Sequence, residues 1–259
     1  MDLSQHDPDS EWKWLYRVAG AAALLSVALI FVAGWVFMHS SPPGFQPTSA
    51  NAREWFTFFQ SHRLAALFDL DLVMVADNVL AIPVFLALYV VLRRISIAWT
   101  TLGVALALVG TAGYFAINPA FSMLSLSGQY AAATTEAERA AALEAGQTTL
   151  AIYQGTGFDL YVLLVSAAGV IIGAVMTRSV FGKLAGICGI LANVLNPGMF
   201  LPSVGLYIGF VALLPLIVWY GRVGWVFLRL GRPIPAKDDS IALTRDLVSP
   251  SLTSQVGLS

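Results

Sequence analysis

The chain has 259 residues, of which 58% are hydrophobic and 11% are charged, and its formal net charge at pH 7 is -1. Because soluble domains carry about 25% charged residues, this composition argues against a soluble domain and favours a surface that faces lipid. The near-neutral charge also argues against a nucleic-acid partner, since phosphate binding requires a basic surface.

Six stretches of the chain are apolar over the length that a helix needs to cross a bilayer. About 20 apolar residues span the ~30 Å hydrocarbon core, and barrel strands would instead alternate polar and apolar residues. The sequence therefore predicts an all-α, polytopic membrane protein with a bundle of six transmembrane helices. These spans are predicted over residues 18–38, 67–92, 98–117, 158–176, 184–201 and 205–227.

The segments outside this transmembrane domain, which covers residues 18–232, are predicted to be tails. Residues 1–17 precede the first span, and residues 233–259 are polar and proline-containing, which predicts disorder. The first span is expected to be retained instead of cleaved as a signal peptide. Its apolar stretch is longer than the roughly 7 to 15 residues of a signal core, and its N-terminal flank is acidic.

Between the first two spans, a proline- and glycine-rich segment precedes a helix predicted from Asn51 to Arg63. This helix carries Trp55, Phe56, Phe58 and Phe59. Aromatic residues beside a span usually lie at the level of the lipid headgroups. We therefore expect an interfacial anchor, with a surface that stacks a ligand as the alternative.

Between spans three and four, the sequence predicts a short outer amphipathic helix over residues 136–152. Thr135 and Glu138 have the spacing of a capping box, and Glu136 adds negative charge where the helix dipole favours it. Gly155 and Gly157 interrupt the pattern before the fourth span. We expect this helix to pack over the outer mouth of the bundle.

Polar side chains inside the spans are candidates for function because they are costly in lipid. The hypothesis is a polar cleft open to the outside, and its candidate residues are Asp77, Asn78, Asn193, Asn196 and Asp159. The alternative is structural, since carboxylates are stabilised near helix N-termini and asparagines hydrogen-bond between helices.

Two further patterns bear on the same helices. The seven-residue spacing of Asp71 and Asn78 predicts that they share one helix face. Pro83 and Pro197 each follow polar residues in the middle span of one half of the chain, an arrangement found in transporters with inverted repeats. No residue-level similarity between the halves accompanies it.

The basic residues predict the orientation of the bundle. With a cytoplasmic N-terminus, only Arg53, Arg63 and Arg139 of the 14 lysines and arginines fall outside, which leaves 11 inside. This is the positive-inside pattern. We therefore expect a multi-pass protein of the cell (plasma) membrane with both termini in the cytoplasm.

Other functional signals are sparse. Gly169 and Gly173 have small-residue spacing, which close packing within the bundle explains and which leaves a homodimer through this face as an alternative. The three histidines have no partner at a metal-ligand spacing, and catalytic and phosphate-binding motifs are absent from the sequence. We therefore expect no metal, no cofactor and no catalytic residue.

Four segments resemble a bacterial family of six-span membrane proteins known as domain of unknown function 4386. They are residues 130–146 (YAAATTEAERAAALEAG), 153–158 (YQGTGF), 178–183 (RSVFGK) and 189–193 (GILAN). The resemblance extends over residues 18–232. It implies a six-helix membrane domain and implies no activity, cofactor or catalytic residue.

These observations favour a non-enzymatic integral membrane protein that binds a lipid or a partner, or helps an assembly. One alternative is a small-solute transporter or channel that uses the outward-facing cleft around Asp77. A second alternative is a membrane enzyme that acts on a lipid, with Asp77 or Asp159 as the acid or base. The sequence displays no second reactive group beside either aspartate, which disfavours the enzyme.

Overall fold

The computed structural model describes residues 11–39 and 50–232, which fold almost entirely into helices, with no strand among them. The helices are α1 (Lys13–His39), α2 (Ala52–Ser61), α3 (Arg63–Leu67), α4 (Val73–Leu92), α5 (Ile97–Ile117), α6 (Ala120–Ala132), α7 (Glu136–Tyr153), α8 (Thr156–Met176), α9 (Gly182–Leu195) and α10 (Gly205–Leu230). Phe68–Leu72 forms a π-helical turn before α4, and Asn196–Phe200 forms a 3-10 turn after α9. The predictions for residues 1–10, 40–49 and 233–259 lie outside the described residues.

Six helical stretches of the described chain are long and apolar enough to cross a membrane. They contain α1, α4, α5, α8, α9 and α10, which overlap the six predicted spans. The prediction of an all-α bundle with six helices of membrane length is confirmed.

The six long helices pack as a ring in which each contacts two neighbours. α4 packs on α5, α5 on α8, α8 on α9, α9 on α10, α10 on α1, and α1 on α4. All six contribute to one apolar core, whose fully buried side chains include Leu88, Leu92, Ile172, Met176, Phe181 and Phe227. The ring therefore encloses packed hydrocarbon side chains.

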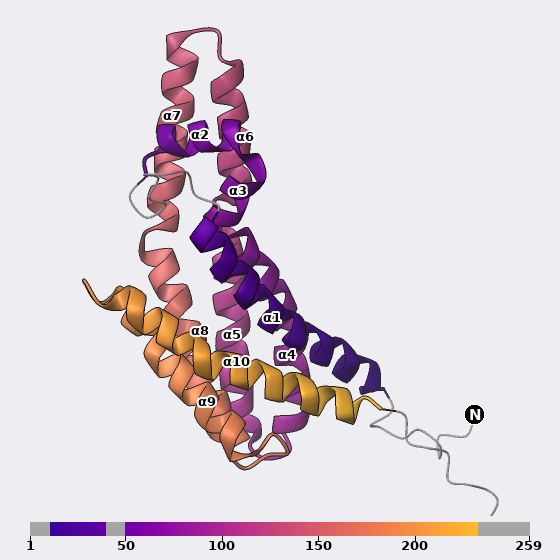
Figure 1. The fold of residues 1–259 in the computed structure, drawn as a ribbon. Helices are drawn as coiled ribbons and strands as arrows, with labels where there is room; N and C mark the ends of the chain where they lie inside the picture. Colours follow the sequence, from indigo (N-terminus) through magenta and orange to yellow (C-terminus); the bar gives the residue numbers. More distant parts are fainter. Residues whose placement is uncertain (1–10, 40–49, 233–259) are drawn as a thin grey trace, which may run out of the picture.

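The two ends of the described chain lie together on one side of the ring. Nε of Arg17, near the start of α1, donates a 2.7 Å hydrogen bond to the carbonyl of Gly231, just after α10. The α4–α5 and α8–α9 connections lie on this side as well (Figure 1). We name it the termini side, and the opposite side the hairpin side.

On the hairpin side, α6 and α7 form a helical hairpin that projects beyond the bundle (Figure 1). α6 follows α5 after a two-residue break at Asn118 and Pro119, and α7 leads into α8. The helix predicted over residues 136–152 is confirmed as α7. The sequence did not predict α6, and the expected position of α7 was wrong, because α7 packs along α6 and stands away from the mouth of the bundle.

α2 crosses the hairpin, and its aromatic side chains form the centre of a second core (Figure 1). Trp55, Phe56, Phe58 and Phe59 are each at most 3% exposed. Phe56 also anchors the helix through its carbonyl, which accepts a hydrogen bond from the hydroxyl of Ser127 in α6 at 3.2 Å. The expectation that these rings face lipid headgroups was wrong, because α6 and α7 cover them.

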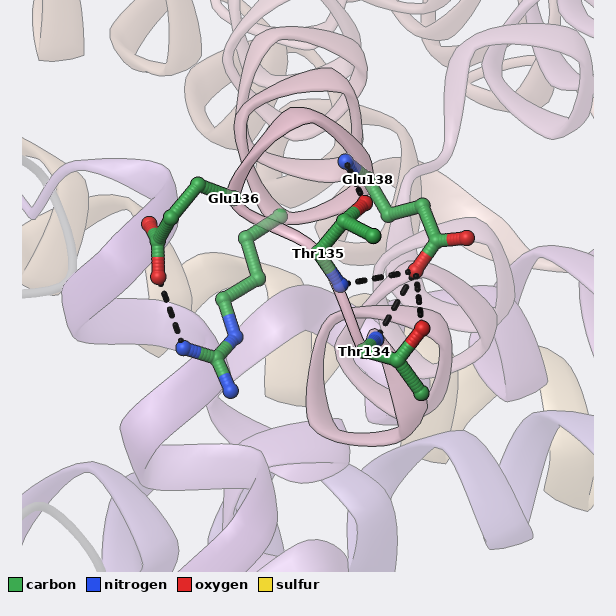
Figure 2. A network of polar contacts seen from close by, with 5 residues as sticks. Thr134, Thr135, Glu136 and Glu138 are labelled. Carbon is green, nitrogen blue, oxygen red and sulfur yellow. Dashed lines mark hydrogen bonds and ion pairs between the residues drawn. The ribbon is translucent and has the colours of Figure 1, made fainter.

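The predicted capping box begins α7 at the tip of the hairpin (Figure 2). The Thr135 hydroxyl accepts a hydrogen bond from the backbone N–H of Glu138 at 3.2 Å, and the Glu138 carboxylate accepts from the N–H groups of Thr134 and Thr135 at 2.8 and 3.1 Å. Glu138 precedes Phe158 by 20 residues in the sequence, or about 30 Å of helix. It therefore lies outside the apolar segment of α8. The N–H groups of Thr134 and then Thr135 favour the charged form and lower its pKa.

The glycines of α8 allow close contact with α9. Asn193 of α9 occupies the space where a side chain at Gly169 would lie, and a Cβ added at Gly173 would lie 2.9 Å from the carbonyl oxygen of Gly186. Packing within the bundle therefore accounts for both glycines. A homodimer through this face stays a prediction, and it would have to displace α9.

Substitution of Gly173 tests this close contact. Gly173→Ala should destabilise the protein by about 1–3 kcal/mol, because the backbone of α9 cannot move aside as a flexible side chain could. Gly113→Ala is the control, since a Cβ at Gly113 meets nothing within 4 Å. Thermal unfolding of the purified protein in one detergent measures the difference, and equal midpoints for the two variants would contradict the packing.

Substitution of Glu138 tests the cap. Glu138→Gln should speed hydrogen–deuterium exchange at the amides of Thr134 and Thr135, whereas Glu136→Gln removes only the 3.0 Å pair with Arg139 and should leave those amides unchanged. Because the pKa of Glu138 is lowered in the folded chain, its stabilising effect is complete above the ordinary pKa of the carboxyl. The effect is lost as pH falls through the lowered value. Equal exchange in both variants would refute the cap.

Candidate functional site

The polar residues of the bundle gather on its hairpin side, where the chain enters α4 through the π-helical turn. Leu70 and Asp71 leave helical geometry there, and Asp71 has a φ of 66°, in the left-handed region. This conformation costs about 1–2 kcal/mol for a residue with a side chain. Asp71 therefore does not continue the helix of Asn78, and the expectation that the two share one helix face was wrong.

Tyrosines hold this turn in place. The Tyr153 hydroxyl, at the end of α7, donates to the Asp71 carboxylate, and the Tyr114 hydroxyl of α5 donates to the Asp71 carbonyl at 3.4 Å. Nδ2 of Asn118 donates in turn to the Tyr114 hydroxyl at 3.0 Å. The turn before α4 is thus hydrogen-bonded to α5, which leads into α6, and to α7.

Asn78 lies in α4, seven residues after Asp71, and is buried. Its Nδ2 donates to the carbonyl of Met74 and to the hydroxyl of Tyr161, each at 3.0 Å, and its Oδ1 accepts from the Thr111 hydroxyl at 3.2 Å. The rings of Tyr114 and Tyr161 lie 4.8 Å apart. We name Asp71, Asn78, Thr111, Tyr114, Tyr153 and Tyr161 the tyrosine network.

Asp77 points to the other side of α4, toward α1 and α10. The Tyr220 hydroxyl of α10 donates to Oδ2 of Asp77 at 3.4 Å. The Ser26 hydroxyl of α1 lies beside the carboxyl, but within the described residues neither this hydroxyl nor Oδ1 of Asp77 makes a hydrogen bond of normal geometry. The adjacent residues Asp77 and Asn78 therefore belong to two separate clusters.

The remaining predicted site residues lie elsewhere. Nδ2 of Asn193 donates to the carbonyl of Gly189 in its own helix at 2.8 Å, and Nδ2 of Asn196 donates to the Ser166 hydroxyl of α8 at 3.2 Å. Asp159 is exposed in the first turn of α8. The structure therefore places the five candidates in four locations, since Asn193 and Asn196 alone share one, and a shared ligand-binding role for them stays a prediction.

Sequence analysis did not identify the tyrosines, because a tyrosine ring contributes to apolar composition as phenylalanine does. Their hydroxyls nonetheless need partners when buried. The spacing of Thr111, Tyr114 and Asn118 places all three on one face of α5. This stripe of polar tips in an apolar helix is the signal that could have located the network.

Two hollows in the described part of the chain are separate from the tyrosine network. One, of about 520 Å³, lies between α6 and α7, and its lining includes Leu126, Ala141 and Glu138. The other, of about 410 Å³, is an apolar groove between α1 and α4. Among the described residues, no group of three histidine, cysteine or carboxylate side chains could hold a metal ion.

Comparisons of the chain with protein-family models, with curated proteins and with solved structures give no match. The chemistry of the site therefore has to be interpreted from its own geometry. The hydrogen bonds of the tyrosine network connect α4, α5, α7 and α8, and most of its polar groups are used in these bonds. Such an arrangement holds the four helices together.

Removal of Asn78 tests whether the network stabilises the fold. Asn78→Leu keeps the branched outline of the side chain but leaves the hydroxyls of Thr111 and Tyr161 without this partner, so stability should fall by about 1–3 kcal/mol. Tyr207→Phe is the control, because Tyr207 is 70% exposed. The measurement is thermal unfolding in detergent. An Asn78→Leu protein as stable as the parent would show that these bonds contribute nothing.

Proposed function

We propose that the chain is a non-enzymatic multi-pass protein of the cell membrane that uses its α6–α7 hairpin to bind a protein partner on the outer face. The termini side would face the cytoplasm, in keeping with the distribution of basic residues. Membership in the six-span family that the sequence resembles is part of this proposal. The observation that carries it is that the hairpin has a core of its own and projects beyond the bundle.

The construction of the hairpin supports a binding role. α2 is joined to both helices, since its Phe56 carbonyl accepts from Ser127 of α6 and the backbone N–H of Ala52 donates to Gln147 of α7 at 3.2 Å. A rigid surface loses little conformational entropy when a partner binds. The hollow between α6 and α7 combines an apolar lining with the carboxylate of Glu138. This chemistry suits a protein segment with an apolar side chain beside a basic one.

The transporter alternative has one observation in its favour, the buried Asp77 carboxyl with an oxygen that lacks a normal hydrogen bond. Transport would also need a polar path through the rest of the bundle. Between this cluster and the termini side, the buried side chains of the described core are predominantly apolar, including Leu88, Ile172 and Phe227. The packing therefore favours binding over transport.

The lipid-enzyme alternative needs a second reactive group beside the acid or base. Asp159 is exposed at the start of α8, and the groups described beside Asp77 are the hydroxyls of Tyr220 and Ser26. Among the described residues, Asp77 is the carboxylate that both hydroxyls meet, so it would have to serve as the base for the attacking group and as the acid for the leaving group. We therefore do not favour the enzyme.

Site-specific photo-crosslinking in intact cells tests the hairpin. A photoreactive amino acid at Ala141, which is exposed and lines the hollow, should give a discrete protein adduct. The same residue at Leu214, which is 66% exposed on α10, should give lipid adducts alone. Mass spectrometry of the adducts measures this. Absence of a protein adduct at Ala141, or identical protein adducts at both positions, would refute the proposal.

Solute flux tests the transporter alternative. Proteoliposomes containing the parent protein should take up no more of a panel of labelled ions, amino acids and sugars than protein-free liposomes, and Asp77→Asn should behave in the same way. The reason is that apolar side chains fill the termini half of the bundle. Uptake by the parent that disappears in Asp77→Asn would favour transport over our proposal.

A further inference from the structure

The termini side of α10 carries two arginines stacked on one tryptophan. The guanidinium carbons of Arg222 and Arg229 lie 4.7 and 3.6 Å from the ring centroid of Trp225. Their spacing of three and four residues from Trp225 places all three on one face of the helix. The ring is 42% exposed, so this face is open to its surroundings.

Neither arginine is neutralised within the described part of the chain. Arg222 forms no ion pair there, and its Nε donates to the carbonyl of Phe181 at 3.4 Å. Arg229 forms no ion pair in these residues either. Since a stacked guanidinium keeps its N–H edge free, both side chains have donors left for an external acceptor.

The α8–α9 connection and the first turn of α9 add two more cations to this region. The Phe181 ring packs edge-on against Phe227 of α10 at 5.2 Å, and the Phe181 carbonyl receives the bond from Arg222. Arg178 and Lys183 flank Phe181 closely in the chain. Four basic residues, from α10, the α8–α9 connection and the start of α9, therefore lie near the second half of α10.

The described residues on this side carry a large excess of positive charge. Among the described residues, the termini side has a single carboxylate, Glu11, since the other described acidic residues lie on the hairpin side or in the adjoining half of the bundle. The described basic residues on this side are Lys13, Arg17, Arg93, Arg94, Arg178, Lys183, Arg222, Arg229 and Arg232. The complementary ligand is an anion.

The position of the cluster along α10 indicates which kind of anion would bind there. Arg222 lies eight residues, or about 12 Å of helix, before Leu230, where the last turns of α10 would pass through the headgroup region. Tryptophan is enriched at that depth, and arginine extends its guanidinium toward the headgroups. Guanidinium groups bind phosphate through paired hydrogen bonds. If α10 crosses the membrane, a lipid phosphate at this depth would be within reach of both arginines.

We propose that Arg222, Trp225 and Arg229 form a binding site for the phosphate headgroup of an anionic glycerophospholipid in the leaflet on the termini side, with Arg178 and Lys183 contributing charge. The site is separate from the hairpin, so it does not depend on the partner proposed above. It does depend on the membrane placement of α10.

Native mass spectrometry of the full-length protein tests the site. The purified protein is titrated with phosphatidylglycerol and, separately, with phosphatidylcholine of the same acyl chains. The parent should bind phosphatidylglycerol preferentially, and Arg222→Gln with Arg229→Gln should lower that affinity about tenfold or more, because two charge-assisted phosphate contacts are lost. Circular dichroism and size-exclusion chromatography confirm that the variant is folded.

The matched control is Arg93→Gln with Arg94→Gln, which removes the same charge on the same side, where Arg93 lies 5.6 Å from the ring of Tyr89. This control should keep the preference for phosphatidylglycerol. Arg222→Lys with Arg229→Lys keeps the charge but loses the paired donors, and it should bind with intermediate affinity. If the glutamine variant does not fold, the lipid affinity of the lysine variant tests the site instead.

Three results would overturn the site. The first is a parent protein without preference for the anionic lipid, and the second is an equal loss of affinity in the Arg93 and Arg94 control, which would assign binding to the general surface charge. The third is displacement of phosphatidylglycerol by millimolar inorganic phosphate, which would make the ligand a free phosphate. The site would be supported if the affinity for phosphatidylglycerol falls only in the α10 variants and inorganic phosphate does not displace the lipid.

Discussion

Hydrocarbon neither donates nor accepts hydrogen bonds, and this constraint determines where the polar side chains of the bundle lie. Asn78 is buried at a position where Tyr161 and Thr111 satisfy its amide. The Asn193 amide donates to a carbonyl of its own helix, and the Asn196 amide donates to the Ser166 hydroxyl of α8. Polar residues in these helices therefore act first as connections, and a ligand would have to compete with the bonds they already make.

The hairpin side follows a different pattern, in which charged side chains are exposed and aromatic rings are buried. α7 exposes Glu136, Arg139 and Glu144 there, while α2 buries its aromatic rings against the hairpin. The chain thus has two apolar cores, one in the bundle and one under α2. The tyrosine network lies where they meet, and its bonds to the turn at Asp71 connect the arms of the hairpin to α4.

Composition and local spacing were sufficient to predict the six long helices and the start of α7, because lipid burial and capping depend on residues close in sequence. The second core depends on contacts between distant segments. Phe56 meets Gly146, and the sequence around either residue does not reveal the other. α6 was missed because it begins directly after Pro119 and has no cap or charge to mark it. The left-handed turn at Asp71 is likewise held by Tyr114 and Tyr153, which lie far along the chain.

The apolar core of the bundle lies between the tyrosine network on the hairpin side and the arginine cluster of α10 on the termini side. Phe181 and Phe227 pack beside the Arg222 cluster, whereas Asn78 and Tyr161 lie on the hairpin side of that core. Electrostatic coupling across such a distance is weak, and sites without shared contacts behave additively. A change at the arginines should therefore alter phosphate binding without altering the hairpin, and a change in the hairpin should leave lipid selectivity intact. If the molecule binds a protein at the hairpin and a lipid at the arginines, as we propose, the two events are independent.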